Sequence, residues 1–255
     1  MRNKWYKKKY NAKGRTKAKG LKFPLTLLIL VFLVFSNGLY SQLNVTTVGI
    51  QYKPIFSSNF TGGGTQTAFE GNNKMSLALT KGSSFGLIIR KGLTKSLSFE
   101  TGINSVTRRF QLDFEDLDST VNQSLNFKFI AYEIPVQGLI YIRLGEQSFI
   151  NTALGVSLNT YPGGPVMSIG ENFSQGTVPD TKFQFAIVGN VGYEYRTKKS
   201  GYFYLGASFY NPFNNIGHTT GFYRPPTGDE TISLDVNGNY LTLDLRYFFH
   251  EKPEK

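Results

Sequence analysis

The chain has 255 residues, of which 18% are charged and 15% aromatic, with 27 glycines and no cysteine. The lack of cysteine excludes a disulfide scaffold, a cysteine-ligated metal, a thiol nucleophile and a lipoprotein anchor. With 28 basic and 17 acidic residues the formal net charge is +11, which would suit a nucleic-acid-binding domain if the charge lay on the folded part.

The basic excess lies at the start of the chain. Residues 1–41 hold ten Lys and Arg and no acid, and they include an apolar run of eleven residues from Leu25 to Phe35. A basic flank, a short apolar run and small polar residues are typical of a secretory signal peptide, whereas a spanning helix needs about 20 apolar residues. We predict a cleaved signal peptide over 1–41, with cleavage after Ser41 or Gln42, and one mature domain over 42–255. A retained N-terminal anchor is the alternative.

Without those ten residues, 18 basic and 17 acidic side chains remain, a net charge of about +1. The positive balance therefore indicates an export route, and no nucleic-acid partner is expected.

The mature segment shows repeated alternation of apolar and polar residues, which predicts strands and no long amphipathic helix. Several of the predicted strands are longer than the 5 to 6 residues common in soluble sheets, and they match the roughly 9 to 11 that a tilted membrane strand needs. One face of each is aliphatic and aromatic, as lipid requires, and the other is rich in small polar residues, as a crowded barrel interior requires. Eight strands are predicted, at about 45–56, 83–91, 96–110, 125–144, 148–161, 181–196, 202–211 and 239–249.

The connections alternate strictly in length. Those at 92–95, 145–147 and 197–201 are short, and those at 57–82, 111–124, 162–180 and 212–238 are long. This pattern predicts an all-β fold, an eight-stranded antiparallel up-and-down transmembrane β-barrel with short periplasmic turns and long extracellular loops, in the outer membrane of a Gram-negative bacterium. A soluble β-sandwich is the alternative fold.

Two stretches inside the long connections also alternate. They are Lys74–Thr80 and Glu230–Val236. We interpret them as strand extensions that form hairpins above the membrane, and a count of ten strands stays open. A wider barrel of that kind would suit a passive pore.

Three segments carry a family resemblance. The leader ending in Ser41-Gln42, the segment Tyr132–Val136 (YEIPV) and the closing strand Tyr240–Phe249 resemble the small outer-membrane β-barrel proteins of Bacteroidetes, a family that includes the PorT-like barrels. The resemblance implies a barrel over about 42–255 and, for PorT-like members, an association with type IX secretion and gliding. In barrels of this kind a terminal aromatic residue is read by the barrel-insertion machinery, and here the polar tail 250–255 departs from that pattern.

Charged residues on the polar strand faces must pair inside a barrel, because an isolated charge there would be very costly. We expect a structural cluster that plugs the lumen, and a proton or ion path is the alternative. The predicted cluster consists of Arg90, Glu100, Glu133, Glu194, Asp244 and Arg246.

The loops offer little catalytic chemistry. In the second long loop we expect simple solvation of four carboxylates, with divalent-cation binding as the alternative; they are Asp113, Glu115, Asp116 and Asp118. His218 lies in a long loop without a spaced nucleophile motif, so no catalytic residue, metal site or cofactor is predicted.

The sequence therefore predicts a non-enzymatic barrel that is structural or binds a partner. Its expected partners are outer-membrane lipid, the barrel-insertion machinery and an envelope or secretion-system protein. A narrow pore and a lipid A hydrolase at the rim are the alternatives.

Overall fold

The computed structural model describes residues 45–94, 96–163, 166–225 and 228–250. The predicted signal peptide over 1–41 and the polar tail after His250 lie outside these residues. The described part is an all-β, antiparallel structure, and its only helical element is a short 3-10 turn, η1 (Asn59–Thr61).

The larger sheet consists of β1 (Thr46–Phe56), β2 (Gln66–Glu70), β3 (Asn73–Gly92), β4 (Leu97–Asp116), β5 (Asn122–Arg143), β6 (Ser148–Thr160), β9 (Phe183–Arg196), β10 (Tyr202–Pro212) and β13 (Tyr240–Phe248). The smaller sheet consists of β7 (Val166–Ile169), β8 (Phe173–Pro179), β11 (Gly217–Tyr223) and β12 (Glu230–Val236).

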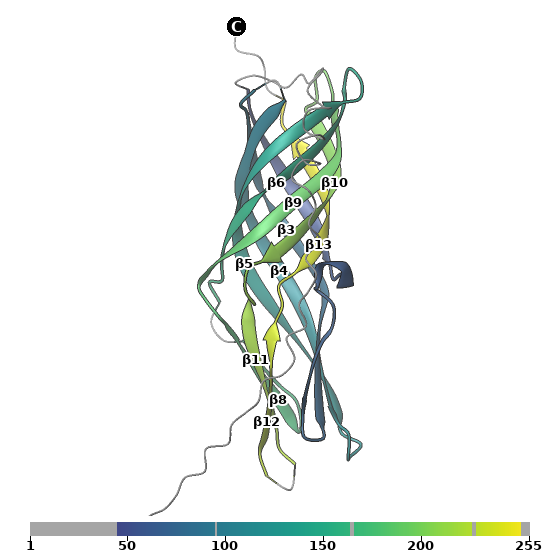
Figure 1. The fold of residues 1–255 in the computed structure, drawn as a ribbon, viewed down its shortest axis with the longest axis vertical. Helices are drawn as coiled ribbons and strands as arrows, with labels where there is room; N and C mark the ends of the chain where they lie inside the picture. Colours follow the sequence, from purple (N-terminus) through teal and green to yellow (C-terminus); the bar gives the residue numbers. More distant parts are fainter. Residues whose placement is uncertain (1–44, 95, 164–165, 226–227, 251–255) are drawn as a thin grey trace, which may run out of the picture. The chain divides into compact units, whose positions relative to one another are not determined.

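The hydrogen-bonded pairings of the larger sheet return to their starting strand. They run from β1 through β13, β10, β9, β6, β5, β4 and β3, and β3 pairs again with β1. We call the part enclosed by these pairings the barrel (Figure 1). Because each strand pairs with its sequence neighbour among these elements, the short turns after β3, β5 and β9 all lie at one end.

The sequence predicted eight strands, and the structure has 13 in the described residues. The predicted strands all occur, and β3, β4 and β5 are longer than expected, at 20, 20 and 22 residues. The additional strands lie in the stretches that we expected to be loops. The residues at 74–80 belong to β3 and those at 230–236 are β12, so both alternating stretches noted in the sequence form strands.

These extra strands form a second region at the other end of the barrel, which we call the extension. It consists of the smaller sheet, β2, and the far parts of three barrel strands, at 73–79, 109–116 and 122–128. Figure 1 shows β8, β11 and β12 beyond the ends of β10 and β13.

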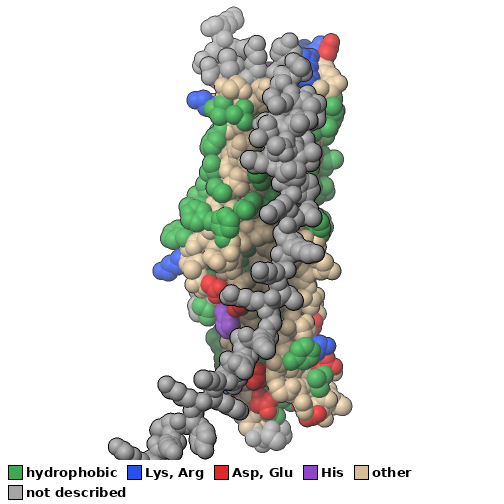
Figure 2. All heavy atoms as spheres, in the orientation of Figure 1, with side chains coloured by type: hydrophobic (Ala, Val, Ile, Leu, Met, Phe, Trp, Pro, Cys, Tyr) green, Lys and Arg blue, Asp and Glu red, His purple; other side chains and the backbone are tan. Residues whose placement is uncertain are grey.

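Side-chain burial in the barrel is the reverse of that in a soluble domain. Leu87 of β3, Ile103 of β4 and Leu154 of β6 are exposed, whereas Glu194 and Asp244 are fully buried. In Figure 2 hydrophobic side chains gather along both flanks of this part of the molecule. The apolar strand faces thus point outward.

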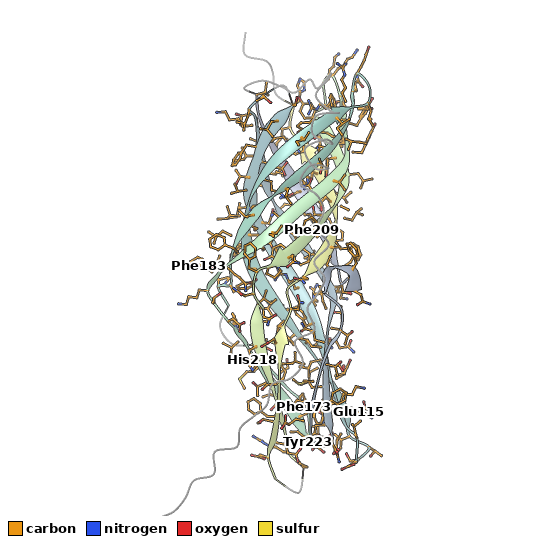
Figure 3. The ribbon with its side chains drawn as sticks, in the orientation of Figure 1. Glu115, Phe173, Phe183, Phe209, His218 and Tyr223 are labelled. Carbon is orange, nitrogen blue, oxygen red and sulfur yellow. The ribbon has the colours of Figure 1, made fainter. Side chains whose placement is uncertain are left out.

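The extension has the ordinary arrangement, with apolar side chains inside. Met75, Leu112 and Phe114 are buried there, and Phe114 stacks on Phe173 with ring centroids 4.3 Å apart. Figure 3 shows Phe173 and Tyr223 within the extension and Phe183 pointing away from the barrel. The core of the extension begins near the barrel rim and continues between its two sheets.

A one-residue bulge in β3 separates the two regions. Leu79 is opposite Phe110 and Lys81 is opposite Arg109, so Thr80 has no partner on β4. A one-residue slip moves every later side chain to the other face of a sheet. Most of the large apolar residues occupy odd positions on both sides of Thr80, and these are buried before it and exposed after it.

Candidate functional site

The lumen of the barrel holds a continuous series of ion pairs. Arg90 pairs with Glu100 at 2.9 Å and with Glu194 at 2.6 Å, and Arg246 pairs with Glu100 at 2.8 Å and with Asp244 at 2.6 Å. The charges alternate in sign along the series and come from strands on several sides of the ring. Because both oxygens or several N–H groups of each member are used, the burial cost of the charges is offset by direct pairing.

Two further cations complete the ends of this series. Lys53 of β1 lies 3.4 Å from Asp244, and Arg196 of β9 lies 2.7 Å from Glu194. Neither was in the predicted cluster. Both follow the inward parity of their strands, Lys53 two positions after buried Gln51 and Arg196 two positions after Glu194, which is the signal that could have identified them.

Aromatic rings cover the guanidinium groups from the sides that the carboxylates leave open. The Arg90 guanidinium carbon lies 4.0 Å from the ring centroid of Phe248, and that of Arg196 lies 4.2 Å from the ring centroid of Phe149. The guanidinium carbon of Arg246 lies 4.6 Å from the ring centroid of Tyr204. Such cation–π contacts are strongest where water is absent, so they stabilise the network further.

Glu133 was predicted in the same cluster, but the structure places it in a second group nearer the extension. Its carboxylate accepts hydrogen bonds from Arg108 at 3.0 Å and from the Tyr240 hydroxyl at 2.8 Å. The Arg108 guanidinium carbon lies 5.0 Å from the ring centroid of Tyr210, and the residue is 1% exposed. Sequence reasoning missed Arg108, although it shares the inward parity of Glu100 and Asn104 on β4.

The spaces between these side chains are small. A cavity lined by Lys53, Glu133 and Tyr210 among others has a volume of about 30 Å³, and one lined by Arg90, Tyr141 and Arg196 among others has about 10 Å³. A cavity of about 10–15 Å³ is enough to hold one water. The first cavity therefore has room for about two water molecules and the second for about one.

The four acidic residues of the predicted cation loop do not form one site. Asp113 and Glu115 lie on β4, where Asp113 accepts from Gln111 and Glu115 pairs with Lys74 at 3.0 Å. Among the described residues no group of three His, Cys, Asp or Glu side chains is arranged to hold a metal ion.

Asp116 and Asp118 are used in local contacts at the β4–β5 turn. Asp116 accepts from the Ser119 hydroxyl at 2.7 Å and from the Tyr223 hydroxyl at 3.0 Å, and Asp118 accepts from Asn72. The Ser119 hydroxyl and the backbone N–H of Asp118 hold the pKa of Asp116 below its ordinary value. The carboxylates therefore cap a turn in this structure.

His218 lies on β11 and forms an exposed pair with Asp235 of β12, with Nδ1 2.9 Å from the carboxylate. Asp229 and Glu230 follow His218 in the sequence, but Glu230 is opposite Tyr223 in the β11–β12 pairing, far along the strand from His218. Figure 3 shows His218 on the extension. It does not line any of the cavities described in this section.

A larger polar cleft lies where the extension meets β9 and β10. Its volume is about 560 Å³. Its walls carry amide groups and a carboxylate, with one exposed aromatic ring, Phe213. The lining residues are Asp180, Thr181, Gln184, Asn211, Pro212, Phe213, Asn214, Asn215, Asn237 and Asn239.

Hydrogen bonds hold the walls of this cleft in place. The Gln184 amide donates to the backbone carbonyls of Asn214 and Asn215, at 3.1 and 2.6 Å. The Asn237 and Asn239 amides donate to the backbone carbonyls of Gly62 and Thr61, at 2.8 and 2.6 Å. The cleft is therefore built on fixed backbone, and it presents amide donors and acceptors to a ligand.

No protein-family model matches the chain, and no curated protein matches its sequence. Among solved structures, the outer membrane protein OprG from Pseudomonas aeruginosa is 12% identical, with a TM-score of 0.48 over 83% of this chain and 99% of that one. The outer membrane protease OmpT from Escherichia coli is 10% identical, with a TM-score of 0.31 over 80% and 96% of the two chains. The translocator domain of the autotransporter NalP from Neisseria meningitidis is 7% identical, with a TM-score of 0.31 over 89% and 96%.

No helix among the described residues has the length and apolar character needed to cross a membrane.

The candidate sites described above are the lumen network, the polar cleft and the surface of the extension.

Proposed function

We propose that the chain is an eight-stranded transmembrane β-barrel of the bacterial outer membrane that binds a partner through its extension. The observation that carries this proposal is the exposed apolar surface of the barrel around a buried charged lumen. Apolar strand faces are stable against lipid, whereas exposing them to water is costly. A closed set of pairings also leaves no strand edge with unpaired backbone groups in the bilayer. The short turns then face the periplasm and the extension faces the outside.

The location can be tested on the full chain produced in a Gram-negative host. We expect it in the outer-membrane fraction, with a gel migration that changes on boiling, and we expect protease added to whole cells to cut only within the extension. Recovery in the soluble periplasm would contradict the proposal.

We propose that the lumen is closed and structural. The Arg90–Glu194 and Glu100–Arg246 pairs join non-neighbouring strands across it, and the two cavities near them hold only about two waters and one water. Purified barrel in a planar bilayer should therefore give no stable conductance steps. Regular large steps would instead favour the narrow pore.

The polar cleft supports binding of a neutral hydroxyl-rich ligand, a glycan. Amides of Asn211, Asn214 and Asn215 can both donate to and accept from sugar hydroxyls, and the ring of Phe213, which is 59% exposed, offers a stacking surface. We expect the full chain in detergent to bind members of a printed array of bacterial and host oligosaccharides.

The matched variants are Phe213→Ala in the cleft and Phe69→Ala, a phenylalanine of similar exposure on β2. The Phe213 change should abolish most array binding and the Phe69 change should leave it intact. Equal binding by both variants would exclude the cleft as the glycan site.

A protein partner is the second candidate. Met167, Ile169 and Phe222 are exposed on the outer face of the smaller sheet, at 67%, 80% and 40%. Exposed apolar side chains gathered on one face are typical of an interaction surface. This supports an envelope or secretion-system partner of the PorT-like kind, which crosslinking in the native envelope would capture. The proposal assigns no catalytic role, and unchanged lipid A masses with and without the protein are expected.

A further inference from the structure

Three basic side chains form a row around the outside of the molecule at the level of the β3 bulge. Lys81 of β3 is directly opposite Arg109 of β4, and Arg109 is directly opposite Lys128 of β5. All three side chains are exposed. Neighbouring strands are about 4.8 Å apart, so the row places three cations side by side.

Repulsion between these three cations destabilises the sheet unless negative charges lie nearby. Like charges directly opposite on neighbouring strands destabilise a sheet. The flanking rows are uncharged, with Ala78, Gln111 and Asn126 on the side of the extension and Ser83, Thr107 and Ile130 on the side of the barrel.

The described residues provide no carboxylate within ion-pair distance of Lys81, Arg109 or Lys128. Lys74, farther out on the same strand as Lys81, does pair with Glu115. The row is therefore a set of cations that no carboxylate of the described residues neutralises, which leaves it open to an anionic ligand.

The position of the row identifies the kind of counter-charge. On the barrel side, the outward residues become apolar within two to three rows, with Phe85 and Tyr132 in the second row and Ile103 in the third, exposed at 58%, 43% and 49%. On the other side they are polar. Acyl chains packed on the apolar side would place lipid headgroups at the level of Lys81, Arg109 and Lys128.

We propose that Lys81, Arg109 and Lys128 bind the phosphate groups of a phosphorylated glycolipid, lipid A, in the outer leaflet. This inference rests on the proposed outer-membrane location. Three adjacent cations match a lipid that carries two phosphates better than a phospholipid that carries one. Arg109 provides bidentate donors for a phosphate oxygen pair, and the two lysines provide flexible point charges on either side.

The test uses the full chain, folded in detergent, and native mass spectrometry with added lipid A bearing two phosphates. The variant carries Lys81→Gln, Arg109→Gln and Lys128→Gln. The control carries Lys91→Gln, Lys198→Gln and Lys199→Gln, which removes the same charge from exposed positions at the short-turn end. Each lost charged hydrogen bond is expected to weaken binding about tenfold, so the row variant should bind at least about tenfold more weakly and the control within about twofold.

Three further ligands identify the source of the phosphate. Lipid A with one phosphate should bind the unaltered protein more weakly, and phosphatidylglycerol more weakly still. Inorganic phosphate at millimolar concentration should not displace lipid A. Equal affinity for lipid A and phosphatidylglycerol would overturn the proposal, as would full displacement by inorganic phosphate or unchanged binding by the row variant.

Boil-dependent gel migration of both variants shows whether they fold. If the variants fold and reach the outer membrane but lipid A binding is unaffected by the row, only this inference fails. If the unaltered chain is absent from the outer membrane, the proposed function fails independently.

Discussion

The barrel and the extension share three long strands but have opposite polarity. On β4, inward Glu100 and Asn104 of the barrel give way to inward Phe110 and Leu112 of the extension, with no change of parity. The outward face changes in the other direction, from Phe99 and Ile103 to residues such as Arg109. In the proposed outer-membrane location, the outward face of this one strand would meet lipid in the barrel and water in the extension, and its side chains change accordingly.

On β3 the polarity of the two faces also reverses between the extension and the barrel, but for a different reason. Most of its large apolar residues keep odd positions throughout, and the unpaired Thr80 rotates them from the inside to the outside. On β4 the type of side chain on each face changes at the boundary, whereas on β3 the bulge turns the same kind of side chain to the other face. Either change can mark the boundary between the barrel and the extension.

The largest expected effect comes from deleting Thr80. The deletion would turn Phe85 and Leu87 into the lumen and Arg90 outward, unless the extension shifts instead. We expect no folded, boil-sensitive band after refolding into lipid vesicles. The control, Thr80→Ala, keeps the bulge and loses only the hydrogen bond to the Arg109 carbonyl, at a cost of about 0.5–1.5 kcal/mol. Normal folding of the deletion would show that the bulge does not set the register.

Breaking the lumen network should have the next largest effect. Arg246→Ala leaves Glu100 and Asp244 without one of their partners, and removing one member of a buried pair costs about 3–5 kcal/mol. The unfolding midpoint of the barrel on a semi-native gel should fall. Lys199→Ala, which removes an exposed cation from a turn, should leave it unchanged. An unaltered midpoint for Arg246→Ala would contradict a structural role for the pairs.

The outward face of one strand, β4, allows a direct comparison of the surroundings of the barrel with those of the extension. Ile103 and Gln111 both point outward on β4, one in the barrel and one in the extension. Arginine near the middle of a bilayer costs about 2–4 kcal/mol. Ile103→Arg should therefore make folding into vesicles less favourable by that amount, and Gln111→Arg should change it little. Similar losses for both variants would contradict the membrane boundary between them.

The smallest expected effect concerns the extension alone. The Ser119 hydroxyl lowers the pKa of Asp116, so the ionised carboxylate stabilises the turn at pH above its ordinary value of 3.8, and this contribution is lost as the pH falls below it. Limited proteolysis with pepsin should cut the β4–β5 turn more readily at pH 2 than at pH 4. In Asp116→Asn this difference should be reduced, while the barrel stays intact at both values.

The sequence predicted the barrel strands well because their alternation is strong and their outward faces are almost purely apolar. It predicted loops where the extension lies, because β7 has only four residues and β11 is short and rich in Gly and Thr. The stretch at 74–80 was recognised as alternating, but the slip at Thr80 cannot be read from the pattern, since the large apolar residues keep the same parity on both sides.

For the lumen, parity placed Arg90, Glu100 and Arg246 on inward faces, yet sequence could not say which charges meet across the ring. That depends on the stagger between strands. Glu133 illustrates this, because its strand position sets it beside Arg108 at the other level. The polar cleft was not foreseen, since its residues come from separate segments of the chain.

The pairing of β1 with β13 joins the first and last described strands. Until β13 is available, β1 and β10 each have an unpaired edge, and such edges promote aggregation. Pairings between residues so distant in sequence also form slowly. The ring therefore cannot be completed during synthesis of the earlier strands, and a chain cut short before residue 240 would carry two open edges and become a substrate for quality-control proteases.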